Sequence, residues 1–191
     1  MIRALALLLL LCGCSAPFAG LVPGGEGAAR GFLDTGGLSY GDIVPACETP
    51  QTALGTEVAR YPERGRGYRL YDTSPGDTAL RPHFLTGFSD GCPRKFLAAL
   101  AIFGGPAAYE TTRASSAGAA PRSETDVEYE AIRRRVCAAP LGQTCPARRF
   151  SRLESRAVFV SVYQRFGTNP TWADMLIYDG EVIAKDFKSL R

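Results

Sequence analysis

The amino-acid sequence predicts one α+β domain over residues 32–191, with an antiparallel sheet of about five strands and about three packed helices. Three observations support this prediction. Asp179-Gly180 separates two largely apolar segments, and this dipeptide is typical of the tight turn of a β-hairpin. Residues 124–137 carry apolar side chains at helical spacing behind a capping pattern. Hydrophobic residues make up 46% of the chain and charged residues 21%, which is enough apolar surface for a core.

The first half of the chain contains residues that are typical of helix starts and helix ends. Thr49-Pro50 combines an N-cap residue with a proline in the first helical turn, and Pro62 would end that helix. Pro93 and Gly104 bracket a second apolar stripe in the same way. The predicted order is a helix over 49–61, strands over 68–72 and 83–88, helices over 93–103 and 124–137, and strands over 158–163, 172–178 and 181–187. Residues 107–122 are rich in Ala, Ser and Gly and give no clear signal.

The helix expected over 124–137 has an ordered charge pattern. Thr125 and Glu128 match a capping box, and acidic residues in the first turns precede the basic triplet Arg133–Arg135. This order complements the helix macrodipole, so the triplet has a structural explanation. A site for an anion or a lipid headgroup is the alternative.

The C-terminal third predicts a buried strand followed by a hairpin. Residues 158–163 are apolar on one face and largely apolar on the other, as in a central strand covered on both sides. The two-residue loop at 179–180 sets the register of the hairpin. The expected cross-strand pairs are Tyr178 with Glu181, Asp174 with Lys185, and Trp172 with Phe187.

The N-terminus combines Arg3, eight apolar residues over 4–11, and small residues at the exit, which together are typical of a secretory signal peptide. The exit sequence Leu11-Cys12-Gly13-Cys14 resembles the lipobox of bacterial lipoproteins. This resemblance implies that residues 1–13 are removed and that Cys14 is acylated and holds the chain in a lipid bilayer. Ser15 follows the cysteine where aspartate would favour the inner membrane, so the resemblance implies the outer membrane, facing the periplasm. Ordinary secretion with a later cleavage is the alternative.

Residues 14–31 are then the acylated cysteine and a flexible tether, because the segment after Cys14 is rich in Gly, Ala and Pro and has no periodicity. The net charge of +3 is spread along the chain and predicts no nucleic-acid partner. The sequence indicates no cofactor.

Six cysteines support export. Removing Cys12 with the signal peptide and committing Cys14 to lipid leaves an even number, which in an oxidising compartment predicts two disulfides. Cys137 and Cys145 enclose a short loop and are expected to pair, which leaves Cys47 with Cys92. Zinc binding is the alternative, but there is no C-x-x-C spacing and a single histidine, so no metal site is expected.

Two motifs suggest enzymes, and each has a simpler explanation. Residues 37–41 match the G-x-S-x-G nucleophile elbow with Ser39 at its centre, and His83 is the only histidine that could serve it. The elbow needs a strand before the serine and a helix after it, and the glycine-rich surroundings predict neither. Residues 34–36 form a lone D-T-G, whereas aspartic proteases need two such loops. We therefore expect a non-catalytic envelope module for binding or structure, with a serine hydrolase using Ser39 and His83 as the alternative.

Overall fold

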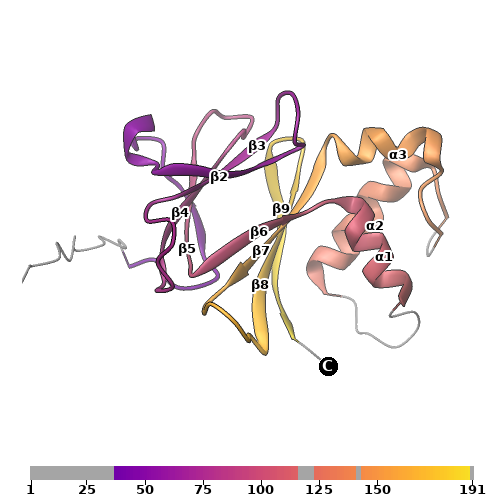
Figure 1. Ribbon diagram of the computed structural model, residues 1–191. Helices are drawn as coiled ribbons and strands as arrows, with labels where there is room; N and C mark the ends of the chain where they lie inside the picture. Colours follow the sequence, from indigo (N-terminus) through magenta and orange to yellow (C-terminus); the bar gives the residue numbers. More distant parts are fainter. Residues whose placement is uncertain (1–36, 116–122, 141–142, 190–191) are drawn as a thin grey trace, which may run out of the picture. The chain divides into compact units, whose positions relative to one another are not determined.

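The computed structural model describes residues 37–115, 123–140 and 143–189. They form three layers: a five-stranded antiparallel sheet, a four-stranded antiparallel sheet and a layer of α-helices (Figure 1). The predicted α+β class with about three helices is confirmed. The strands, however, form two sheets and not the single sheet of about five strands that we expected.

The five-stranded sheet has the order β1-β5-β4-β3-β2 and the four-stranded sheet the order β6-β7-β8-β9. The first contains β1 (Ile43–Pro45), β2 (Thr56–Tyr61), β3 (Tyr68–Asp72), β4 (Arg81–Thr86) and β5 (Arg94–Ala98). The second contains β6 (Leu100–Gly104), β7 (Ala157–Tyr163), β8 (Thr171–Tyr178) and β9 (Glu181–Ser189). The helices are α1 (Pro106–Ser115), α2 (Glu124–Cys137) and α3 (Ala147–Glu154), with one 3-10 turn at Gln51–Ala53.

The four-stranded sheet is buried on both faces. On β7, Val158, Val160 and Val162 are at most 1% exposed and belong to the core between the two sheets. Ala157 and Phe159 point the other way, into a second core shared with the helices. The prediction of a central strand covered on both sides is confirmed.

One continuous segment serves both sheets, because β5 ends at Ala98 and β6 begins at Leu100. At the junction the Ala99 amide donates a hydrogen bond to the Tyr163 carbonyl (2.9 Å). The Ala99 carbonyl accepts one from the Arg81 guanidinium (2.9 Å). The chain therefore changes sheets without leaving a buried polar backbone group unpaired.

The helix predicted over 93–103 is wrong for a reason that lies in this corner. Phe96 and Ala98 face the core between the sheets, and so do Ala101 and Phe103. Each pair has the two-residue alternation of a strand, and the corner shifts the alternation by one residue. Phe96, Leu100 and Phe103 nevertheless recur at intervals of four and three residues, which is the spacing that indicated a helix.

The helix predicted over 49–61 is also wrong, since these residues form a single 3-10 turn followed by β2. Gly55 separates the two with a φ of +94°, a conformation that favours glycine. A Cβ atom there would lie 2.3 Å from the Asp72 carbonyl oxygen, so no larger residue fits. The strand predicted over 68–72 is confirmed, and the one expected over 83–88 lies at 81–86.

Helix α2 has the predicted bounds, but its cap uses different residues. The Ser123 hydroxyl accepts from the Asp126 amide (3.4 Å), and the Asp126 carboxylate accepts from the Ser123 amide (3.2 Å). Thr125, which we expected to cap with Glu128, instead donates its amide and hydroxyl to Asp186 of β9 (3.0 Å each). Helix α1 occupies part of the segment without a clear signal, and the sequence did not predict α3.

The hairpin forms around Asp179-Gly180, and Tyr178 pairs with Glu181 as predicted. The two more distant pairs are wrong, because an extra residue on β9 shifts the register between Leu176 and Ile177. The observed pairs are Asp174 with Asp186 and Trp172 with Lys188. The Trp172 ring stacks on Tyr163 (centroids 6.2 Å apart) and not on Phe187.

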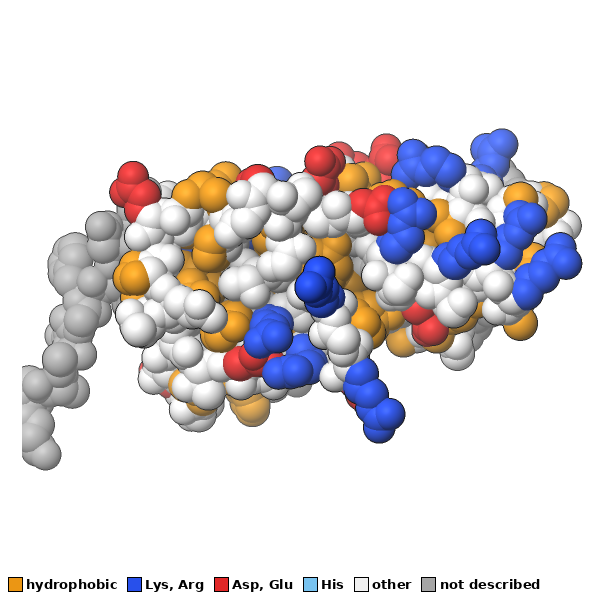
Figure 2. Space-filling model, turned by 90° about the horizontal axis from the view of Figure 1, so that it is seen from above, with side chains coloured by type: hydrophobic (Ala, Val, Ile, Leu, Met, Phe, Trp, Pro, Cys, Tyr) orange, Lys and Arg blue, Asp and Glu red, His pale blue; other side chains and the backbone are white. Residues whose placement is uncertain are grey.

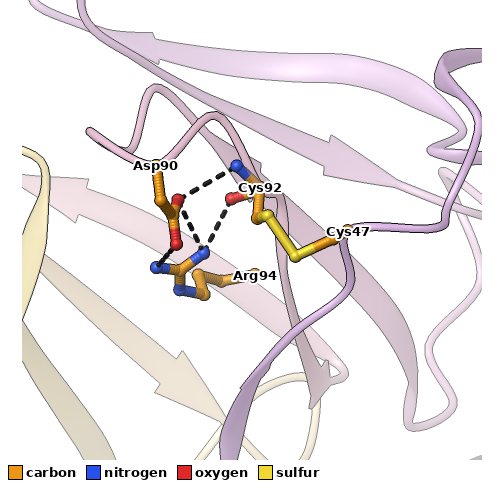
Figure 3. Close-up of a disulfide and its surroundings, with 4 residues drawn as sticks. All are labelled: Cys47, Asp90, Cys92 and Arg94. Atoms are coloured by element: carbon orange, nitrogen blue, oxygen red, sulfur yellow. Dashed lines mark hydrogen bonds and ion pairs between the residues drawn. A yellow bond between two sulfur atoms is a disulfide. The ribbon is translucent and has the colours of Figure 1, made fainter.

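Both predicted disulfides are confirmed: Cys47 with Cys92 and Cys137 with Cys145. The first joins the segment before the 3-10 turn to the loop before β5 (Figure 3). The Asp90 carboxylate receives hydrogen bonds there from the Cys92 amide (3.0 Å) and the Arg94 guanidinium (2.7 Å). The attached segment carries Leu54 onto the outer face of the five-stranded sheet. The disulfide therefore holds the cover of that face in place.

We predict that the Cys47–Cys92 bridge stabilises the domain more than the Cys137–Cys145 bridge. The first closes a loop with a sequence separation of 45, the second one of 8. Loop-closure entropy then gives about 4 kcal/mol for the first and about 2.5 kcal/mol for the second. Urea unfolding of Cys47→Ala/Cys92→Ala and of Cys137→Ala/Cys145→Ala measures both losses. A larger loss for the second variant would contradict the prediction.

Candidate functional site

The residues predicted for lipidation lie outside the described part of the chain, and this includes Cys14 and the tether over 15–31. Ser39 lies in an exposed turn, where its amide donates to the Asp42 carboxylate (3.0 Å). A turn at 40–41 and then β1 follow it, so the helix that a nucleophile elbow requires after its serine is replaced by a strand.

His83 is 2% exposed in the core of the five-stranded sheet. Its Nε2 lies 3.4 Å from the Asp72 carboxylate, its Nδ1 lies 3.2 Å from the Arg81 carbonyl, and its ring stacks on Phe96. Burial lowers the pKa of His83 in spite of the neighbouring carboxylate. These contacts involve both ring nitrogens, and the hydrogen bond described for Ser39 is to Asp42, so the structure does not join His83 and Ser39 as a catalytic pair.

Arg81 and Asp72 form a buried ion pair beside this histidine. The Arg81 Nε donates to Asp72 (2.7 Å), and its terminal nitrogens reach the same carboxylate and the carbonyls of Ala79 and Ala99. The Ser74 amide also donates to Asp72 (2.9 Å), to the same Oδ1 atom that accepts from the Arg81 Nε. Every partner belongs to the domain itself, so this cluster connects β3, β4 and the β5–β6 corner.

A second polar cluster lies where the start of α2 meets the four-stranded sheet. The Lys188 ammonium donates to the Ser123 hydroxyl (2.6 Å) and the Asp126 carboxylate (3.1 Å), and lies 3.9 Å from Asp186. The Tyr109 hydroxyl donates to the same Asp126 carboxylate. A serine–lysine catalytic pair needs a neutral lysine, whereas Lys188 forms an ion pair. The cluster therefore fastens α2 and β9 together.

Asp174 lies next to this cluster and is 5% exposed. Burial raises the pKa of Asp174 to about 6, and the carboxylates of Asp186 and Asp126 act in the same direction. A hydrogen bond from Ser161 (2.9 Å) and the charge of Lys188 oppose this shift. A raised carboxyl pKa is a feature of many functional sites, and Asp174 is the strongest such candidate among the described residues.

The sequence alone does not reveal these polar clusters. Asp174 was detectable as a lone carboxylate in the otherwise apolar strand 172–178. Its neighbours Asp126 and Lys188 come from a distant helix and from the end of β9. Their approach depends on the way α2 packs on the sheet.

Hollows in the surface lie around the helices and β9. One of about 540 Å³ is bounded by Arg135, Arg156 and Tyr178. A second of about 550 Å³ lies between the loop before β5 and β9, and a third of about 670 Å³ between α1 and α3. In the described ranges no group of three or more His, Cys, Asp or Glu side chains is placed to hold a metal ion.

Comparison with protein-family models, with curated protein sequences and with solved structures finds no match to this chain. Two findings bear on its location. The two disulfides indicate an oxidising compartment outside the cytoplasm. None of the helices among the described residues is long and apolar enough to cross a bilayer.

We predict that Asp174→Asn stabilises the domain at pH 8 by about 1–3 kcal/mol. Because the folded pKa of about 6 lies above the ordinary 3.8, the carboxyl contributes stability below pH 3.8 that is lost as the pH rises through 6. Asparagine keeps an acceptor for Ser161 and carries no charge. The gain should therefore shrink as the pH falls from 8 to 4.

Urea unfolding across this pH range tests the prediction. Asp77→Asn, at an exposed carboxylate, is the control and should show no comparable pH-dependent gain. A gain for Asp174→Asn that is the same at pH 4 and pH 8 would refute the role assigned to the buried charge.

Proposed function

We propose that this protein is an exported lipoprotein, anchored by an acylated Cys14, whose domain is a non-catalytic binding or structural module of the cell envelope. The observation that carries the proposal is the pairing of cysteines. Four of the six form the two disulfides, and the remaining two, Cys12 and Cys14, both lie in the lipobox-like sequence. This division matches an exported chain in which one cysteine leaves with the signal peptide and one receives lipid.

The non-catalytic part of the proposal rests on the clusters described above. The reactive groups that they contain are engaged with one another: His83 with Asp72 and Arg81, and Lys188 with Asp126. A general base must reach the proton that it removes, and His83 is buried. These observations favour a module that acts through its surface.

We predict that the protein incorporates labelled palmitate when it is expressed in a Gram-negative host, and that it fractionates with the outer membrane. Cys14→Ser should abolish the label, because the thiol that forms the thioether is gone. Cys12→Ser, two residues away, is the matched control and should still be labelled. Label retained in Cys14→Ser, or a wild-type protein found soluble in the periplasm, would exclude the anchor.

We also predict that a fluorophosphonate probe does not label the protein, since a serine hydrolase is the main rival function. Ser39→Ala should behave like the wild type. Stoichiometric labelling of the wild type that disappears in Ser39→Ala would instead identify an exported serine hydrolase.

A further inference from the structure

The segment that forms the end of α2, the following loop and α3 is strongly basic. Between Ala131 and Arg156 the sequence contains seven arginines and a single acidic residue, Glu154. The Cys137–Cys145 disulfide closes the loop between the two helices. Lys and Arg side chains accordingly gather at the helical end of the molecule, with few acidic side chains among them (Figure 2).

Three of these arginines have partners that explain their presence. Arg133 is buried and forms an ion pair with Glu130. Arg149 donates to the Cys137 carbonyl at the end of α2 (3.0 Å), and Arg156 donates to the Asp179 carboxylate (Nε to Oδ1 2.6 Å). These three stabilise the helix pair and the hairpin turn.

The other four arginines are exposed, and in the part of the chain that the structure describes none of them pairs with a carboxylate. They are Arg134, Arg135, Arg148 and Arg152, and we call them the arginine face. Exposed charges of one sign repel one another and contribute nothing to a core. Their concentration on one rigid helix pair therefore indicates a partner of opposite charge.

The hollow of about 540 Å³ adjoins this face. The guanidiniums of Arg135 and Arg156 lie over the Tyr178 ring, 5.2 and 4.9 Å from its centroid. Such contacts restrain the two side chains at the edge of the hollow. Asp179 is engaged by Arg156, and Glu181 is the carboxylate that would oppose an anion there.

We propose that the arginine face docks on an anionic phospholipid surface, with lipid phosphates contacting Arg135 at the hollow. The choice of a membrane rests on the proposed lipid anchor at Cys14, which would hold the domain beside a bilayer. Between Cys14 and Gly37, where the described residues begin, a fully extended chain reaches at most about 80 Å. That length allows the helical end of a small domain to meet the same membrane.

The test uses the chain from Ser15 to Arg191, which retains both hydrophobic cores and both disulfides but cannot be acylated at Cys14. We expect it to co-sediment with vesicles of phosphatidylcholine containing phosphatidylglycerol, and to bind vesicles of phosphatidylcholine alone much more weakly. Each basic residue near an anionic surface contributes about fivefold in binding. Salt at 1 M should abolish binding, since the Debye length falls to about 3 Å.

Charge variants locate the contact. Arg134→Gln should weaken binding about fivefold, and the quadruple glutamine variant of the arginine face should abolish it. Arg165→Gln is the matched control, because Arg165 is exposed beyond the far end of β7, about 20 Å along that strand from α3. Glu181→Gln, which removes the opposing carboxylate, should strengthen binding.

Equal binding to neutral and anionic vesicles, or equal losses for Arg134→Gln and Arg165→Gln, would overturn the proposal. So would binding to short duplex DNA without binding to anionic vesicles, which would assign the face to nucleic acid. If the protein is labelled by palmitate but does not bind anionic vesicles, the docking proposal is wrong and the proposed lipid anchor stands. If the protein binds anionic vesicles but is not labelled by palmitate, the lipid-anchor proposal is wrong and the docking proposal stands.

Discussion

Apolar residues on both faces of one strand determine the architecture of this domain. Val158, Val160 and Val162 face one side of β7, and Ala157 and Phe159 face the other. A sheet built on such a strand cannot leave either face in water. The five-stranded sheet covers one face and the helices cover the other, which accounts for the three layers (Figure 1).

An ion pair and two disulfides stabilise the parts of this arrangement that apolar packing alone does not hold. At the β5–β6 corner, Arg81 supplies the hydrogen bond that the Ala99 carbonyl needs, and Asp72 neutralises the buried guanidinium. Breaking a buried pair by removing one partner leaves an uncompensated charge, so the two residues depend on each other. The disulfides secure the cover of the five-stranded sheet, which has only a small core, and the loop between α2 and α3.

Local signals in the sequence predicted the elements whose structure is locally determined. The bounds of α2 follow from its own capping and charge order, and the Asp179-Gly180 dipeptide by itself favours a tight turn. The disulfides followed from cysteine parity and from the short loop between two of the cysteines. The corner at Ala99 did not, because Phe96, Leu100 and Phe103 have the intervals of a helical stripe although they lie on two strands. The polar cluster around Lys188 was also beyond prediction, since it joins residues from α2 and β9 that only tertiary packing brings together.

The composition of the chain explains why the basic residues of the arginine face are arginines, but it does not explain why they are grouped there. The chain contains 19 arginines and 3 lysines, so arginine is its usual basic residue wherever one occurs. A general preference for arginine over lysine does not explain why seven fall between positions 131 and 156 with only Glu154 among them. Structural need explains Arg133, Arg149 and Arg156, each of which has a hydrogen-bond acceptor within the domain. Exposed arginines without such partners contribute little to folding, since even paired surface charges are worth about 0–1 kcal/mol. Their grouping is therefore better explained by what the helical end of the domain meets outside itself.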